Sequence, residues 1–264
     1  MFLLWLPLLV LALAEGMNSL RGGLRQFRSW MAAPEGPGRG DGKRFSPVVV
    51  IVPCRGLDQG FEKNMEALFG LECPDFRLIF AVGSESDPAI AKLVNLQQQH
   101  PGTTSEILIA GPARDCGQKV HNLLFAVDHL PLETRSLVLA DSDIRPLPDW
   151  LSALTRTLGR EGTGLASGFR WYMPSEKASF GPLLRSAWNG GILSMMSPED
   201  SFFGWGGALA CARQVFDECE ARESWKGSLS DDYSLSAAVR AHGYKIRFAP
   251  RALSLSHGTC SLGE

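Results

Sequence analysis

Apolar runs alternate with helically spaced apolar residues from Pro47 onward. The runs that predict strands are Pro47–Pro53, Phe76–Val82, Glu106–Ala110 and Leu137–Ala140. The helical spacing between and after them predicts helices over Phe61–Leu71, Pro88–Leu96, Lys119–His129 and Asp149–Leu158. This βαβα order predicts an α/β fold with a mostly parallel central sheet and helices on both faces.

Charged residues follow the predicted strands at their carboxyl ends. They are Arg55 and Asp58 after the first strand, Glu85 and Asp87 after the second, and Asp141 and Asp143 after the fourth. In open parallel sheets, ligands bind beyond the carboxyl ends of the strands. The sequence therefore predicts a polar binding site at this edge.

Asp141-Ser142-Asp143 has the spacing of a metal-binding pair. Two carboxylates one residue apart can share Mg²⁺ or Mn²⁺, which prefer oxygen ligands and can also hold a diphosphate. Acidic residues are also common in turns after strands, so the tripeptide alone fits both interpretations.

A second acidic pair, Asp231-Asp232, begins a predicted helix over Tyr233–Ala241. Ser230 or Asp231 can cap the free amides of its first turn. Since one acid suffices for capping, the other is available as a general base.

Gly204-Trp205-Gly206-Gly207 precedes a predicted strand, Ala208–Ala212. A tryptophan between glycines can stack on a sugar ring or a lipid head, and it can equally belong to a tight turn over the core. On the first interpretation, Trp205, Gly206 and Asp231 line one side of a binding site, which would be the acceptor side if the chain is a transferase. The apolar segment 195–203 before them is either an entry loop for an acceptor or a buried connection.

Composition narrows the functional classes. The chain of 264 residues has a formal net charge of −2 and 20% charged residues, so nothing indicates nucleic-acid binding. Its six cysteines form no CxxC pair, which favours reduced thiols over a disulfide or zinc framework.

The N-terminus is an apolar run, Phe2–Ala14, shorter than the ~20 residues of a comfortable membrane span. It fits a signal peptide cleaved after Ala14, an interfacial helix, or a membrane anchor, and we favour the anchor. The arginines that follow it (Arg21, Arg25 and Arg28) then place the rest of the chain on the cytoplasmic side. We expect an anchor or interfacial helix over residues 1–20, a linker over 21–46, the α/β domain over 47–257, and a truncated C-terminal end over 258–264.

Five motifs in order resemble family-2 glycosyltransferases with the GT-A fold, above all ceramide glucosyltransferases and bacterial hopanoid-biosynthesis transferases. The matching stretches are Pro53-Cys54-Arg55-Gly56-Leu57-Asp58, Ser86-Asp87-Pro88-Ala89-Ile90, Gly117-Gln118-Lys119-Val120-His121-Asn122-Leu123, Ala140-Asp141-Ser142-Asp143-Ile144-Arg145 and Asp231-Asp232-Tyr233. Each motif is weak alone, and the ordered set is specific.

The resemblance implies inverting, metal-dependent transfer of a sugar from a UDP-sugar to the hydroxyl of a ceramide-like or hopanoid-like lipid at a membrane surface. The implied nucleotide-sugar ligands are Pro53, Arg55, Asp87, Lys119, Asn122 and Asp141. Glu85 is a second candidate for the role of Asp87. Asp141 and Asp143 would hold Mg²⁺ or Mn²⁺, and Asp232 would be the catalytic base.

One family motif, QxxRW after the third aspartate, is not found up to Glu264, where His257–Cys260 is the nearest cluster. The expected explanations are a chain that continues in a longer enzyme, or another cation on the diphosphate. A catalytically impaired nucleotide-sugar binding domain and a nucleotidyltransferase are the alternative functions.

Overall fold

The computed structural model describes residues 42–175 and 178–256, together with a few isolated positions between residues 7 and 28. Residues from Gly42 onward belong to one compact unit, Pro37–Glu264. The helices are a short 3₁₀ turn η1 (Gly42–Phe45), α2 (Phe61–Phe69), α3 (Ala89–Gln99), α4 (Gln118–Asp128), α5 (Trp150–Leu158), α6 (Phe180–Leu193), α7 (Arg213–Glu218), α8 (Ala221–Trp225) and α9 (Asp231–Ala241). The strands are β1 (Val48–Cys54), β2 (Phe76–Val82), β3 (Ser105–Ile109), β4 (Ser136–Ala140), β5 (Arg145–Pro146), β6 (Thr163–Tyr172), β7 (Ala208–Ala212) and β8 (Lys245–Ser256).

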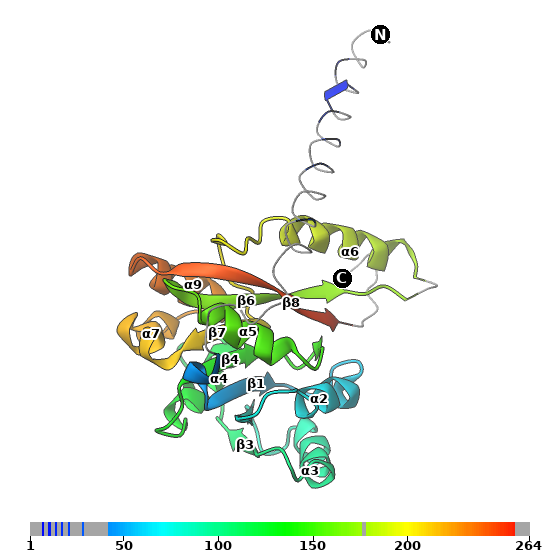
Figure 1. Ribbon diagram of the computed structural model, residues 1–264. Helices are drawn as coiled ribbons and strands as arrows, with labels where there is room; N and C mark the ends of the chain where they lie inside the picture. The colour runs from blue at the N-terminus through cyan, green and yellow to red at the C-terminus, as the bar shows by residue number, and fades with distance from the viewer. Residues whose placement is uncertain are drawn as a thin grey trace. The chain divides into compact units, whose positions relative to one another are not determined.

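The strands form one sheet in the order β3-β2-β1-β4-β7-β6-β8-β5 (Figure 1). Strands β3, β2, β1 and β4 run parallel to one another, as the βα alternation predicts. Their carboxyl ends therefore open on a common edge of the sheet.

Helices cover both faces of the sheet, and successive side chains of β1 point alternately into the two hydrophobic cores that result. Val48, Val50 and Val52 pack with α2, α3 and α5, whereas Val49 and Ile51 pack with α4, α8 and α9. A central parallel strand buried on both faces is apolar throughout, which explains the unbroken run of β-branched residues. The predicted α/β architecture is confirmed.

The second half of the sheet is mixed rather than parallel. Strand β7 runs antiparallel to both β4 and β6, and β8 returns parallel to β6. The expected mostly parallel sheet is thus confirmed, and its antiparallel pairs are those of β7 with β4 and β6 and of β5 with β8. Antiparallel β7 brings the residues before Ala208 to the edge where β4 ends, because Ala208 pairs with Ala140.

The described residues contain no helix long and apolar enough to cross a membrane. The predicted anchor over residues 1–20 and most of the linker over 21–46 lie outside the described residues, as does the C-terminal end over 258–264.

Candidate active site

Asp141 and Asp143 lie at the carboxyl end of β4, in a loop braced from two sides. The Ser142 hydroxyl donates to Asp58 Oδ2 at 2.5 Å, which ties this loop to the one after β1. Asn64, which is 2% exposed, donates from Nδ2 to the Ser142 carbonyl at 3.3 Å and accepts from Arg145. The carboxylates on either side of Ser142 therefore sit on a fixed backbone.

Lys119, in the first turn of α4, bridges two of the acids. Its Nζ lies 2.8 Å from Asp141 Oδ1 and 3.0 Å from Asp231 Oδ1. A cation is disfavoured at a helix N-terminus, and these carboxylates offset that. Burial alone would lower the pKa of Lys119, but the charges of Asp141 and Asp231 outweigh it, and the pKa is raised.

Arg170 of β6 reaches the same loop from the other side. Its guanidinium donates to both oxygens of Asp143 and lies 3.8 Å from Asp141 Oδ2. Its side chain is only 15% exposed. Burial raises the pKa of Asp143 despite the pull of Arg170, and the charge of Asp141 adds to the rise. The negative charges of Asp141 and Asp143 are thus partly neutralised by Lys119 and Arg170.

The glycines before β7 are there because the backbone passes directly against the acids. A Cβ on Gly207 would lie 2.5 Å from Asp141 Oδ2 and 2.9 Å from its Cγ. A Cβ on Gly206 would lie 2.8 Å from Asp231 Oδ2 and 3.1 Å from Asp232 Oδ2. Distances below 3.0 Å leave no room for a side chain, so the glycine pair lets three aspartates converge.

Asp231 and Asp232 have different environments at the start of α9. Asp231 is 4% exposed, with Oδ1 on Lys119 and a buried Oδ2 that has no protein partner among the described residues. Burial raises its pKa against the opposing effect of Lys119. Asp232 is more accessible, and its Oδ2 accepts from the Gly206 amide at 3.1 Å.

The helix cap is Ser230, not Asp231. The Ser230 hydroxyl accepts from the Tyr233 amide and donates to Asp232 Oδ1 at 2.5 Å. Of the two residues that could cap the helix, Asp231 does not, because its side chain contacts Lys119 instead of its own helix. Asp231 belongs to the ionic site.

Asp87 organises the loop after β1. Both of its carboxylate oxygens accept from the Gly56 amide, at 3.1 and 3.0 Å, and Oδ1 also accepts from Ala89 at the start of α3. Gly56 adopts φ +67°, a conformation that favours glycine. Pro53 is part-buried on the strand before this loop, while Arg55 and Glu85 are exposed.

Asn122 lies behind the site rather than on its surface. It is 2% exposed, donates to the Ala81 carbonyl at 3.0 Å and accepts from Gln118 at 2.8 Å. Gln118 in turn donates to the Gly111 carbonyl and accepts from the Ala113 amide. Because the polar atoms of Asn122 are used within the protein, we now expect it to support α4 and not to contact a diphosphate.

Trp205 is part-buried and fits both interpretations offered by its sequence. Its ring packs on Phe169 with centroids 4.6 Å apart, and its amide donates to the Ser167 hydroxyl at 2.8 Å. These contacts fix the turn, and the next residue is Gly206 at the acids.

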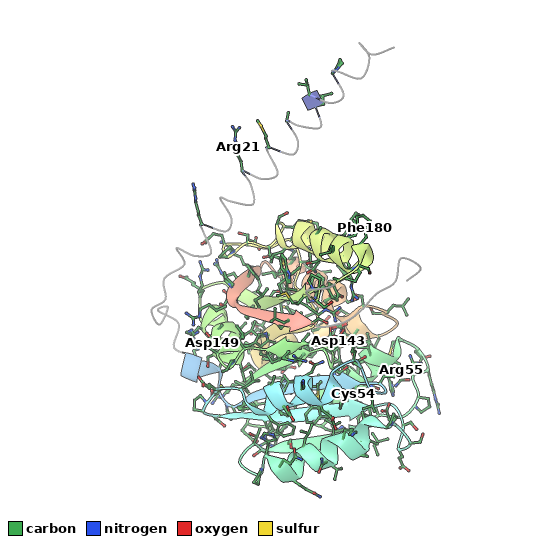
Figure 2. The ribbon with its side chains drawn as sticks, turned by 90° about the vertical axis from the view of Figure 1, so that its right-hand side faces the viewer. Arg21, Cys54, Arg55, Asp143, Asp149 and Phe180 are labelled. Atoms are coloured by element: carbon green, nitrogen blue, oxygen red, sulfur yellow. The ribbon has the colours of Figure 1, made fainter. Side chains whose placement is uncertain are left out.

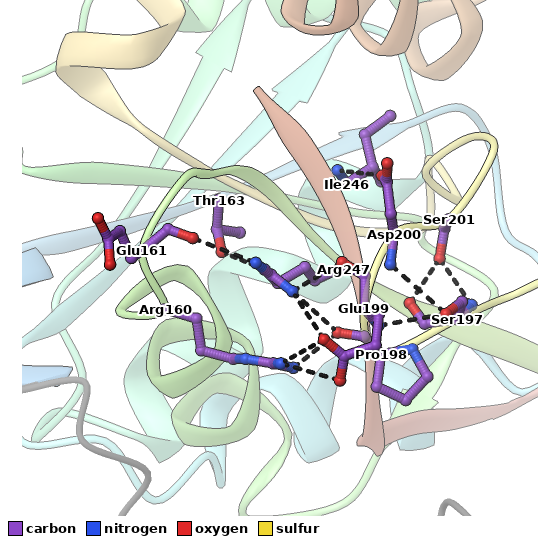
Figure 3. Close-up of polar contacts among 10 residues, drawn as sticks. All are labelled: Arg160, Glu161, Thr163, Ser197, Pro198, Glu199, Asp200, Ser201, Ile246 and Arg247. Carbon is purple, nitrogen blue, oxygen red and sulfur yellow. Dashed lines mark hydrogen bonds and ion pairs between the residues drawn. The ribbon is translucent and has the colours of Figure 1, made fainter. Parts of the chain in front are cut away.

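A network of arginines holds the segment between α6 and this turn (Figure 3). Arg247 of β8 is 6% exposed and donates to Thr163 Oγ1 at 2.9 Å, the Glu199 carbonyl at 2.7 Å and the Glu161 carbonyl at 3.1 Å. Arg160 donates to the Pro198 carbonyl at 2.6 Å and to the Glu199 carboxylate. These bonds fix the start of the segment that leads to the glycine turn.

Sequence reasoning missed Arg170 as a site residue and Asp58 as the partner of Ser142. Arg170 lies within strand β6, which carries no acidic motif. No local pattern marks it, because its partner Asp143 lies in the loop after β4, far from Arg170 in the sequence. The position of Asp58 at a predicted strand end was the available signal.

The site is rich in acid but is not a complete metal centre by itself. No group of three or more histidine, cysteine, aspartate or glutamate side chains within residues 42–175 and 178–256 could hold a metal ion. The site has an excess of negative charge, because four carboxylates lie beside two cations. The carboxylates are those of Asp141, Asp143, Asp231 and Asp232, and the cations are Lys119 and Arg170. Oxygen donors with excess negative charge suit a hard divalent cation whose remaining ligands come from elsewhere.

Similar structures share this fold. A mannosyltransferase, PcManGT from Pyrobaculum calidifontis, solved with GDP-Man and Mn²⁺, aligns with a TM-score of 0.61 and 17% identity, covering 94% of this chain and 67% of that one. GalNAc-T7, solved with UDP, GalNAc and Mn²⁺, aligns with a TM-score of 0.56 and 11% identity, covering 81% and 43%. At these identities the likeness establishes the fold alone.

Two relatives in Caenorhabditis elegans have longer sequences. Ceramide glucosyltransferase 1 is 25% identical over 204 residues, which is 75% of this chain and 43% of the relative. Ceramide glucosyltransferase 3 is 23% identical over 203 residues, with the same coverage of 75% and 43%. The chain therefore spans less than half the length of these curated relatives.

Most of the chain also matches a protein family. Residues 23–264 match the family described as Glycosyl transferase family 21. This confirms the resemblance to glycosyltransferases of the ceramide glucosyltransferase type, with the family number 21 in place of 2. Its motifs, its fold and this match agree, and the chain belongs to Glycosyl transferase family 21.

Proposed function

We propose that the chain carries the catalytic domain of a transferase that moves a sugar from a UDP-sugar to a lipid hydroxyl with inversion at the anomeric carbon. The observation that carries this proposal is the convergence of Asp141, Asp143, Lys119 and the Asp231–Asp232 pair at one edge of the sheet. Such a site offers a place for a cation, a counter-charge for a diphosphate and a base for a hydroxyl.

The nucleotide would lie over the loops after β1 and β2. Asp87 holds Gly56 in place, and Pro53, Arg55 and Glu85 flank this loop. A uridine base is favoured by the motif resemblance over Pro53–Asn122. The fold alone does not determine which nucleotide binds, since similar structures hold GDP-Man in one case and UDP in another.

Asp141 and Asp143 are the residues that would hold Mg²⁺ or Mn²⁺. Both similar structures contain Mn²⁺, and the carboxylates here are oxygen donors in an acid-rich site. A bound cation supplies charge stabilisation to the leaving diphosphate. Lys119 and Arg170 now pair with these acids, and their charges suit the diphosphate once it arrives.

Asp232 is the proposed general base. It is more accessible than Asp231, and the Gly206 amide and the Ser230 hydroxyl orient its carboxylate. It takes the proton as the acceptor oxygen attacks the anomeric carbon and the bond from that carbon to the diphosphate breaks. Asp231, tied to Lys119, has a positioning role.

The relatives support a lipid acceptor. Two ceramide glucosyltransferases match 75% of the chain, so a ceramide-like or hopanoid-like lipid is the proposed acceptor. We place the reaction at a membrane surface on the cytoplasmic side, on the strength of the apolar run Phe2–Ala14 and the arginines after it.

A thermal-shift screen of UDP-, GDP-, ADP- and CMP-sugars, each with and without Mn²⁺, tests the donor. We expect the largest rise in melting temperature with a UDP-sugar and Mn²⁺ together. A larger rise with GDP- or CMP-sugars would overturn the uridine assignment.

Mn²⁺-dependent hydrolysis of the bound UDP-sugar, followed by release of free sugar, separates an active site from a silent one. A chain that binds the UDP-sugar but neither hydrolyses nor transfers it would be the catalytically impaired binding domain. Formation of a nucleotide-sugar from a sugar phosphate and a nucleoside triphosphate would point to the nucleotidyltransferase instead.

A further inference from the structure

Helix α6 directs its apolar side chains away from the domain. They recur at helical spacing along one side, and we call them the α6 outer face. Its members are Phe180, Leu183, Leu184 and Trp188, which are 66%, 50%, 49% and 76% exposed, with Met195 just past the helix at 55%. Figure 2 shows Phe180 on the outer side of α6.

The buried side of the same helix is small. Its buried residues are Gly181, Asn189 and Leu193. Asn189 Oδ1 accepts from the Tyr172 amide at 3.2 Å, and a Cβ on Gly190 would lie 3.4 Å from the Trp171 ring. Helix α6 is thus fixed to β6 by a hydrogen bond and a glycine contact, with little apolar burial.

The helix has a poor intrinsic preference for its own conformation. Pro182 is tolerated only because it lies in the first turn, and Gly190 and Gly191 each weaken a helix. A contiguous exposed apolar surface on a helix of this kind marks an interaction site and not a core element.

We propose that the α6 outer face docks on a lipid bilayer, with Phe180 and Trp188 inserted at the level of the headgroups. Aromatic and leucine side chains on one helix face are typical of helices that lie in a membrane interface. Arg185 is the only charged residue in 178–198, so the surface carries no acid that an anionic leaflet would repel.

The same chain supplies an independent reason for a bilayer. The apolar run Phe2–Ala14, followed by arginines, is expected to hold the protein at a membrane. Tethering raises the local concentration of bilayer at every other surface of the chain, so a modest apolar face suffices for contact. This inference rests on the proposed function in one respect, because a lipid acceptor must come from a bilayer.

The α6 outer face is joined to the acids of the site through one tyrosine. Two guanidinium groups contact the Tyr172 ring, that of Arg185 at 3.6 Å and that of Arg170 at 4.8 Å from its centroid. Arg170 in turn donates to Asp143. A bilayer held against α6 therefore lies near the reacting centre, so an acceptor headgroup can enter the site while its tails stay in the bilayer.

Photo-cross-linking in the full chain tests the contact without requiring activity. The variant Trp188→benzoylphenylalanine, bound to vesicles of phosphatidylcholine with a minority of phosphatidylserine, should cross-link to lipid. The matched control is Leu132→benzoylphenylalanine, at a residue that is fully exposed outside α6. Both proteins keep the N-terminal run, so both are equally close to the vesicle.

We expect at least about tenfold more lipid adducts from position 188 than from position 132. Equal labelling would overturn the proposal. Cross-links from position 188 to a second copy of the chain, or to its own N-terminal residues, would also overturn it and would identify what covers the helix.

A kinetic test uses the double variant Phe180→Ser/Trp188→Ser, with Leu132→Ser as control. Both substituted side chains are exposed, so the melting temperature should change little. The ratio of KM for acceptor in vesicles to KM for acceptor in detergent micelles should rise about tenfold or more, and an unchanged ratio would count against the proposal.

The two proposals fail separately. Lipid cross-linking from position 188 without any sugar transfer would retain the bilayer contact and reject the proposed activity. Sugar transfer to a lipid without lipid cross-linking from position 188 would retain the proposed activity and reject the bilayer contact.

Discussion

Asp141 connects the parts of the site that come from different segments of the chain. It contacts Lys119 of α4, lies 3.8 Å from Arg170 of β6, and faces the backbone of Gly207. The carboxylate is 21% exposed, so solvent and ligands still reach it. A substitution here should therefore reveal ligand binding more than folding.

Asp141→Asn should remove most Mn²⁺-dependent binding of the UDP-sugar, while the melting temperature of the free protein moves little. The amide keeps the shape of the side chain but supplies no charge for a cation. Calorimetric titration with and without Mn²⁺ measures the effect, and Asp217→Asn on an exposed pair with Arg213 is the control. Binding equal to wild type would show that Asp141 holds no metal.

Asp232→Asn should slow transfer by ~10²–10⁴-fold, the range for loss of a general base. Donor affinity should be nearly unchanged, because this acid contacts Gly206 and Ser230 and not the cations. Steady-state kinetics on an active form of the enzyme, combined with donor titration, separate the two effects. Turnover within a few-fold of wild type would remove Asp232 from this role.

Asp231→Asn should affect donor binding, in contrast to Asp232→Asn, which should affect turnover. Its partner Lys119 keeps Asp141 but loses one of its two carboxylates, so donor binding should weaken several-fold while transfer of bound donor continues. Loss of turnover at saturating donor would instead show that the two neighbouring acids have been assigned in the wrong order.

Gly207→Ala should displace Asp141 and reduce both donor affinity and stability, by about 1–3 kcal/mol for the latter. The added Cβ would lie 2.5 Å from Asp141 Oδ2, against a backbone that the β4–β7 pairing holds in place. Gly102→Ala is the control, because a Cβ there meets nothing within 4 Å. Chemical denaturation and donor titration would detect the difference, and wild-type values for both would contradict the crowding argument.

At the level of elements, the segment between α6 and β7 is fixed mainly by Arg247. Arg247→Met should destabilise the protein by about 3 kcal/mol, since it leaves the Glu199 and Glu161 carbonyls without their donor. Arg213→Gln, which breaks an exposed pair, should change stability by less than about 1 kcal/mol. Urea unfolding of both variants compares them, and similar losses would show that burial of Arg247 is not decisive.

Sequence patterns predicted some elements well and others not at all. The strand Ala208–Ala212 has the expected bounds, and the βα units before Ala140 agree to within a few residues, because each buries a continuous or periodic apolar face. Helix α6 went unrecognised since its apolar residues face outward and its sequence contains Pro182, Gly190 and Gly191.

Contacts between residues far apart in the sequence could not be predicted for the site. The motifs brought Asp141, Lys119 and Asp231 to one place by resemblance, but the bridge of Lys119 between the two acids is a tertiary contact. The antiparallel insertion of β7 between β4 and β6 likewise depends on pairing across the sheet, which no local period encodes.

For the whole molecule, deletion of residues 1–20 should shift the protein from the membrane to the soluble fraction of cells. The run Phe2–Ala14 is the most apolar segment expected to insert, and a peripheral helix face such as that of α6 binds weakly and reversibly by itself. Cell fractionation with immunoblotting measures the shift. Recovery of a secreted chain beginning at Glu15 would show that the segment is a signal peptide.

The single antiparallel contact of β4 with β7 divides the chain into successive halves. Residues 48–143 hold the proposed nucleotide-sugar ligands and the metal-binding acids, while residues 145–256 hold α6, Trp205 and Asp232. The proposed donor ligands thus precede the proposed acceptor residues along the polypeptide, while Arg170, Gly207 and Asp231 of the second stretch support the donor site from across the sheet. Chimaeras joined between Asp143 and Arg145 that keep Arg170, Gly207 and Asp231 should therefore exchange acceptors among related transferases without altering the sugar they deliver.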